Sequence, residues 1–94
     1  MSESPDFLRT RDLLRETGIT HQILYRYVTM GLVREEAQGD GGHRVFPPET
    51  VGVIKLIQRL NQSGYTLRDI KDIFFKDGRL DEVRARRIEA DAGE

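Results

Sequence analysis

The chain of 94 residues is long enough for one small domain; it carries 15 Lys and Arg against 16 Asp and Glu, and it has no cysteine. The lack of cysteine excludes a disulfide framework and a thiolate metal centre. The two histidines, His21 and His43, have no third ligand at a familiar metal-binding spacing. We therefore expect neither a metal nor another cofactor.

The sequence carries no recognisable targeting segment. The N-terminus, MSESPDF, lacks a basic region followed by an apolar run, so we expect no signal peptide and a disordered leader over residues 1–7. The longest apolar-rich stretch, residues 51–60, is interrupted by glycine and by charged side chains, so no membrane span is expected. These features favour a cytoplasmic protein without a membrane partner.

Positive charge gathers in the middle of the chain. Residues 9–71 hold ten Lys or Arg against seven Asp or Glu, whereas residues 1–8 and 72–94 each carry a net charge of -2. This distribution favours a polyanionic partner, although neutral domains also show such imbalance.

The first predicted helix covers residues 11–17. Thr10 is positioned to accept a backbone N–H as the N-cap, and Gly18 to end the helix in the left-handed conformation. Leu13 and Leu14 are expected to form its buried face.

A second predicted helix follows after a short turn. Thr20 is its expected N-cap, residues 21–30 form the helix, and Gly31 ends it. Two short helices joined by a glycine-containing turn are typical of a helix-turn-helix.

The faces of this second helix differ in chemistry. Leu24 and Val28 share one face, with Ile23, Tyr27 and Met30 beside it, and this face is expected to pack on the first helix. The opposite face carries groups that donate to phosphates or read base edges in a major groove, the alternative being an ordinary solvated face. Its members are His21, Gln22, Tyr25, Arg26 and Thr29.

A β-hairpin is predicted from residues 32–37 and 43–46, across the glycine-rich turn 38–42. A nucleotide-binding P-loop is excluded because no Lys-Ser/Thr pair follows the glycines to open a helix. The glycines instead allow close backbone approach, and Gly42, His43 and Arg44 are candidate contacts to a phosphate backbone. An ordinary flexible turn is the alternative. The pair Glu35 and Glu36 is interpreted as a solvated strand edge.

Two further helices are predicted downstream. One begins near Pro48 and Glu49 and runs to about residue 62, with apolar residues at three-residue spacing. The next begins at the capping-box-like Thr66–Asp69 and ends at Gly78. Its expected apolar face consists of Leu67, Ile70, Ile73 and Phe74.

The remainder of the chain is highly charged. Residues 79–92 have only Leu80, Val83 and Ile88 as sparse apolar points. A solvated helix face is the expected setting of Lys71, Lys76 and Arg79.

Four motifs, in this order along residues 8–76, resemble the DNA-binding domain of MerR-type transcriptional regulators. They are an apolar residue and Thr before the second helix, the run Leu24, Tyr27, Gly31 and Leu32, the wing Gly42, Arg44 and Phe46, and the segment Ile57, Leu60, Gly64, Tyr65, Thr66 and Leu67. The resemblance implies a mainly α, winged helix-turn-helix fold with a short β-hairpin wing and two further helices. It also implies that residues 20–30, Thr20 included, enter the major groove and that the hairpin tip grips the backbone.

The sequence departs from this family at several positions. Gln22 stands where the family often has Arg, Arg26-Tyr27 replaces paired tyrosines with Tyr25 shifted one place earlier, and Phe46 replaces a common wing tyrosine. The family resemblance also implies a long dimerisation helix, but only residues 77–94 follow here, as a short tail or the start of such a helix. Both an excised part of a longer regulator and a small natural regulator remain open.

The leading hypothesis is a sequence-specific DNA-binding transcriptional regulator that pairs as a homodimer through the C-terminal segment or on DNA. The alternatives are a protein-interaction module and an excisionase-like or architectural module on the same fold. An enzyme is not expected, because no carboxylate pair or Ser/Thr–His arrangement has motif context.

Overall fold

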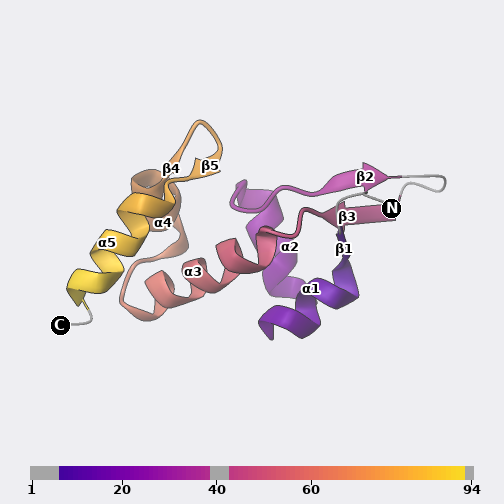
Figure 1. Cartoon of the computed structure of the whole chain (residues 1–94), viewed down its shortest axis with the longest axis horizontal. Helices are drawn as coiled ribbons and strands as arrows, with labels where there is room; N and C mark the ends of the chain where they lie inside the picture. The colour runs from indigo at the N-terminus through magenta and orange to yellow at the C-terminus, as the bar shows by residue number, and fades with distance from the viewer. Residues whose placement is uncertain (1–6, 39–42, 93–94) are drawn as a thin grey trace, which may run out of the picture.

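The computed structural model describes residues 7–38 and 43–92. The molecule is elongated, with extents of 46 × 30 × 26 Å. Figure 1 shows two lobes joined by helix α3 (Thr50–Gln62), with the helix-turn-helix and a small sheet at one end and the C-terminal elements at the other. The leader expected over residues 1–7 falls, except for Phe7, outside the described residues.

Helix α1 (Thr10–Thr17) begins one residue earlier than predicted. Its N-cap is Arg9, whose backbone N–H donates to the Asp12 carboxylate at 3.3 Å, so the prediction of Thr10 as the cap is wrong. The carboxylate of the third helical residue, Asp12, accepts from the backbone N–H of Arg9, which makes Arg9 the N-cap. Gly18 ends the helix with φ of 78°, as predicted.

Helix α2 (His21–Met30) agrees with its prediction at both ends. The Thr20 hydroxyl accepts a hydrogen bond from the Ile23 backbone N–H at 3.2 Å, which satisfies one of the unpaired donors of the first turn. Gly31 follows with φ of 84°, a conformation that strains any residue with a Cβ.

The wing is an antiparallel sheet of the order β1-β3-β2, built from β1 (Leu8–Arg9), β2 (Glu36–Gln38) and β3 (His43–Phe46). The predicted second strand matches β3, but the first is shorter and later than predicted. Leu32 and Val33 instead lie in an irregular segment, where both are buried in the core. Gln38 pairs with His43 and so belongs to the strand rather than to the turn.

Helix α3 carries the largest part of the core. Ile54 and Ile57 are fully buried, and α3 contacts α1 in one lobe and α4 and α5 in the other. Its N-cap is Glu49, and its C-cap is Ser63, one residue before the glycine predicted to end it. Because one apolar helix packs against both lobes, it determines how the two are joined.

Helix α4 (Leu67–Phe74) has the predicted capping box, in which Asp69 N–H donates to the Thr66 hydroxyl at 3.0 Å. Ile70 and Phe74, four residues apart, lie on the buried line of this helix. Ile73 was expected beside them but is 37% exposed. It lies at the boundary of a helix that ends one residue later.

The chain after α4 forms a hairpin of β4 (Phe75–Lys76) and β5 (Arg79–Leu80), not a continued helix. Its turn residues Asp77 and Gly78 have φ of 54° and 78°, the left-handed pair that tight hairpins require. Gly78 therefore turns a hairpin rather than ending a helix. For the same reason Lys76 and Arg79 do not lie on a helix face.

The last helix, α5 (Glu82–Ala92), packs against α3 and α4. Ala85 is its fully buried residue within the described side chains, whereas Val83 is 70% exposed. The side chain of Ile88, the third predicted apolar point of this segment, lies outside those described.

The position of α3 in the core predicts a large difference between two isoleucine truncations. Ile54→Ala removes a fully buried side chain and should lower the free energy of unfolding by about 2–5 kcal/mol. Ile73→Ala is the matched control, and its cost should stay below about 1 kcal/mol. Urea denaturation followed by circular dichroism measures both; equal losses would contradict the observed packing.

Candidate nucleic-acid interface

Two buried side chains orient helix α2. Leu24 is 3% exposed and Tyr27 is 5% exposed, and both belong to the core cluster that includes Leu13 and Ile54. Since successive residues of a helix are turned by about 100°, anchoring these two positions turns the opposite side of α2 outward.

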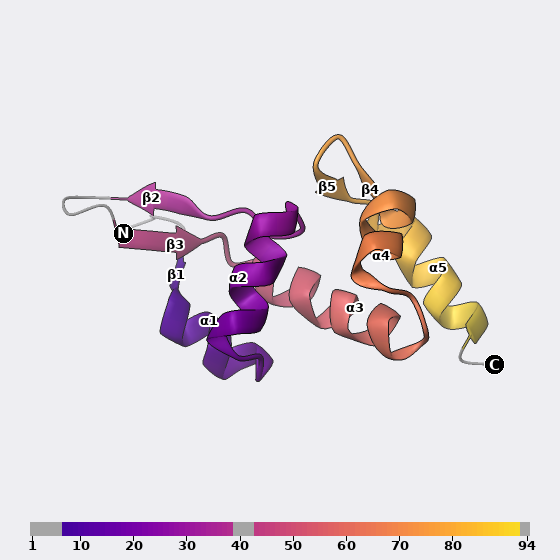
Figure 2. The same ribbon diagram turned by 180° about the vertical axis from the view of Figure 1, so that it is seen from behind.

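That outward side holds the predicted recognition residues. Each of Thr20, His21, Gln22, Tyr25, Arg26 and Thr29 is exposed, and Tyr25 reaches 73%. In Figure 2 the described part of the chain places no other element in front of α2. The predicted face is therefore accessible along the whole helix.

The residues on this side differ in whether their side-chain polar groups already have a hydrogen-bond partner. The hydroxyls of Thr20 and Thr29 already take part in the helix: the first caps it, and the second donates to the Tyr25 carbonyl at 2.8 Å. The side chains of Gln22 and Arg26 make no hydrogen bond or ion pair with the described part of the protein. Their polar groups are thus available to a partner molecule.

The wing brings one charged group to the same lobe. Arg44 lies on β3 opposite Ala37, and its side chain is 60% exposed. Its Nη1 lies 3.0 Å from Oε2 of Glu35 in an ion pair. Figure 2 shows the β2–β3 hairpin extending from the lobe that contains α2.

The structure describes neither of two predicted wing residues, Gly42 and His43, in full. Gly42 lies outside the described residues. The backbone of His43 pairs with Gln38, and its side chain is not among those described.

Sequence reasoning missed the role of Glu35. It was interpreted with Glu36 as a solvated strand edge, yet it precedes β2 and holds the guanidinium of Arg44. Opposite charges nine residues apart across a predicted hairpin were the available signal, but the pairing depends on a register that the sequence did not reveal. Ile23, expected beside the inward face of α2, is also 38% exposed and adds an apolar group to the outward side.

Within residues 7–38 and 43–92, no group of three His, Cys, Asp or Glu is arranged to hold a metal ion. No helix in the same part of the chain is both long and apolar enough to cross a membrane.

Burial perturbs one titratable group of α2. Desolvation raises the pKa of the Tyr27 phenol above its usual value of 10.0, and the neighbouring charge of Arg26 opposes this rise. A raised pKa in the folded state favours the neutral phenol, so its contribution to stability is complete below pH 10.0 and is lost as the pH rises through the folded-state pKa.

The direction of this pKa shift predicts how the stability of the variant Tyr27→Phe, which has no ionisable hydroxyl, depends on pH. Between about pH 8 and about pH 11 the wild type should lose more free energy of unfolding than the variant loses. Urea titrations of both proteins at the two pH values measure the difference. An identical pH dependence would show that Tyr27 ionises as freely in the folded chain as in the unfolded one.

Comparison with known proteins shows the family of this chain. The model of the family described as "MerR HTH family regulatory protein" matches residues 8–76. The chain is 33% identical over 63 residues to the nodulation protein NolA of Bradyrhizobium elkanii, covering 67% of this chain and 29% of that protein.

Two other relatives are more distant. An uncharacterised HTH-type transcriptional regulator of Synechocystis is 27% identical over 66 residues, covering 70% of this chain and 48% of that protein. The mercuric resistance operon regulatory protein of Bacillus cereus is 27% identical over 62 residues, covering 66% of this chain and 47% of that protein. The chain thus spans less than half the length of these relatives, and no solved structure matches it significantly.

The family match covers the helix-turn-helix, the wing, α3 and α4, which are the elements that carry and support the exposed face of α2. The chain therefore belongs to the MerR family of helix-turn-helix regulatory proteins, which are DNA-binding transcriptional regulators.

Proposed function

We propose that this chain binds duplex DNA sequence-specifically, with α2 in the major groove and the β2–β3 wing on the phosphate backbone. The observation that carries the proposal is the exposed polar face of α2, held outward by Leu24 and Tyr27. The family supports DNA binding as the general activity, and the exposed face of α2 and the exposed Arg44 on the wing support assigning it to these two elements.

Helix α2 has the size and chemistry for a major groove. Its 10 residues span about 15 Å, and a groove about 12 Å wide admits an α-helix. Gln22 has an amide suited to bidentate recognition of adenine, and Arg26 a guanidinium suited to guanine or phosphate. We assign base reading to Gln22, Tyr25 and Arg26, with Thr20, His21 and Thr29 at the margins of the contact.

The wing contributes charge rather than sequence reading. The Arg44 guanidinium is exposed on the hairpin, where it is able to donate to a phosphate oxygen. We place Gly42 and His43 beside it in the same backbone contact. The nearby Glu35 carboxylate opposes this contact in two ways: it forms an ion pair with Arg44, and its negative charge repels the phosphate.

A homodimer is part of the proposal. Two copies joined through the C-terminal segment, or side by side on DNA, would read half-sites about 34–36 Å apart or a multiple of that spacing. We assign residues 8–76 to DNA binding and residues 77–94 to the tail that would join the copies.

Arg44→Ala should weaken binding to all duplexes by a similar factor, because the lost contact is to the backbone. The slope of log affinity against log salt should become shallower by about 0.9, the value for one lost phosphate contact. Fluorescence anisotropy over a salt series measures both effects. Arg84→Ala, an exposed arginine on α5 in the other lobe, is the control and should leave the slope unchanged. An unchanged slope for Arg44→Ala would refute the wing assignment.

Gln22→Ala should change the preference between duplexes more than the mean affinity. Replacing one base-reading side chain should cost roughly 1–3 kcal/mol of discrimination at one base position. Selection from a random duplex pool, performed for wild type and variant, measures this change. Identical selected sites would remove Gln22 from the reading surface.

A twofold-symmetric site in the wild-type pool supports the dimer, whereas an asymmetric site would contradict it.

Glu35→Gln should strengthen DNA binding and leave the fold intact. The substitution keeps the size of the side chain but removes the charge that pairs with Arg44 at 3.0 Å. Glu36→Gln, one residue along and also exposed, is the matched control for net charge. Anisotropy at low salt should show a larger gain for Glu35→Gln. Equal gains would mean that only net charge matters and that the ion pair does not restrain Arg44.

Two further assays distinguish the alternative functions. A protein-interaction module would cause no mobility shift of mixed duplex DNA in a gel at low salt. An architectural module would bind with little sequence preference and would bend DNA in a circular-permutation assay.

A further inference from the structure

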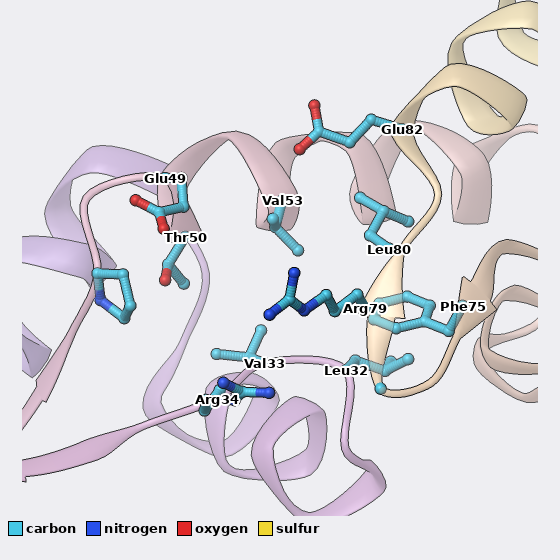
Figure 3. Close-up of a pocket in the computed structure, with 12 residues that line it drawn as sticks. Leu32, Val33, Arg34, Glu49, Thr50, Val53, Phe75, Arg79, Leu80 and Glu82 are labelled. Carbon is cyan, nitrogen blue, oxygen red and sulfur yellow. The ribbon is translucent and has the colours of Figure 1, made fainter.

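A cleft of about 410 Å³ lies between the two lobes, away from the exposed face of α2. It is enclosed by the segment that follows α2, by the start of α3 and by the β4–β5 hairpin with the first residue of α5 (Figure 3). These segments are distant in the sequence. The volume falls in the range of about 300–1,000 Å³ that is usual for small-molecule sites.

The walls of this cleft combine apolar and polar side chains in nearly equal measure. Leu32 and Val33 contribute from the first lobe, Val53 from α3, and Phe75 and Leu80 from the hairpin. Phe75 and Leu80 are paired in the β4–β5 register, so their side chains lie on the same face of the hairpin. An apolar body of a ligand would therefore meet aliphatic and aromatic groups from both lobes.

A positive group projects into this cleft. Figure 3 shows the Arg79 guanidinium in the middle of the cleft between Val53 and Val33, with Arg34 on the same side as Val33. Neither guanidinium makes a hydrogen bond or an ion pair with any other described residue, and both side chains are exposed. Their N–H groups are therefore open to an anionic ligand.

The acidic residues of the cleft do not neutralise these arginines. Glu49 and Glu82 also line it, but Figure 3 places their side chains at its periphery, and neither is ion-paired to Arg34 or Arg79. The Arg79 guanidinium therefore lies nearer the middle of the cleft than either carboxylate. This arrangement favours a ligand whose anionic end lies inside, against Arg79.

We propose that the cleft is a binding site for a small organic anion, with an apolar body against Val33, Val53, Phe75 and Leu80 and an anionic head on the Arg79 guanidinium. Arg34 provides a second donor for the same head. This site lies outside the proposed DNA-binding surface, and its existence does not depend on DNA binding. Because its walls come from both lobes, a bound anion would hold the lobes together and raise thermal stability.

Sodium octanoate is a suitable probe because it combines an apolar chain with one carboxylate. An NMR titration of the full chain should shift the backbone amides of Val33, Val53 and Leu80 and give a dissociation constant. Octylammonium, which has the same chain and the opposite charge, should bind at least roughly tenfold more weakly, as expected for losing a charge-assisted hydrogen bond. This comparison uses the wild-type protein and does not depend on the folding of any variant.

A pair of variants locates the anionic head. Arg79→Gln should weaken octanoate binding by roughly tenfold or more, since the amide keeps a donor but loses the charge. Lys55→Gln, an exposed lysine of α3 outside the cleft lining, should leave it unchanged. The proposal is overturned if octanoate shifts none of the three amides, if octylammonium binds equally well, or if both variants lose the same affinity.

Discussion

The exposed face of α2 depends on the burial of two of its own side chains. Leu24 and Tyr27 lie three residues apart on one side of the helix, and both are buried in a core shared with α1 and α3. The helical repeat then leaves no choice about which residues face outward. Thr20 at one end and Gly31 at the other limit the helix to ten residues, so the exposed face is short and its ends are defined.

Helix α3 extends this constraint to the rest of the molecule. Its buried residues contact α1 on one side and α4 and α5 on the other, so the lobe that contains α2 and the C-terminal lobe share one apolar support. The segment that follows α2 enters the interlobe cleft within two residues of Gly31. The lining of the cleft therefore begins directly after the helix whose exposed face is proposed to contact DNA.

Features determined by local contacts were predictable from the sequence. The caps at Thr20 and Thr66 involve side chains three residues from their partners, and the two faces of α2 follow from its periodicity. Thr10 failed as a cap because the Asp12 carboxylate accepts from the Arg9 N–H, and the helix begins one residue earlier, at Thr10 itself. Leu32 and Val33 are residue types that favour strands, but they pack into the core as part of an irregular segment. Only tertiary packing decides between those two outcomes.

The parts of the site that were missed depend on contacts between segments distant in sequence. Arg44 was identified as a wing residue, whereas its ion pair with Glu35 follows from the position of the chain before β2. Arg79 was expected on a solvated helix face, and Gly78 was expected to end a helix. The Asp-Gly pair instead makes a tight turn, and this turn brings Arg79 into the cleft. A single residue in the left-handed conformation does not distinguish these two uses of glycine.

The most direct test of the account is an NMR titration of the full chain with a duplex recovered by selection from a random pool. The account predicts that the largest amide shifts lie in residues 21–29 and in β3 next to Arg44, and that α5 changes little. Shifts concentrated in α5 and in the β4–β5 hairpin, with α2 unchanged, would contradict the claim that the outward face of α2 and the wing contact DNA together.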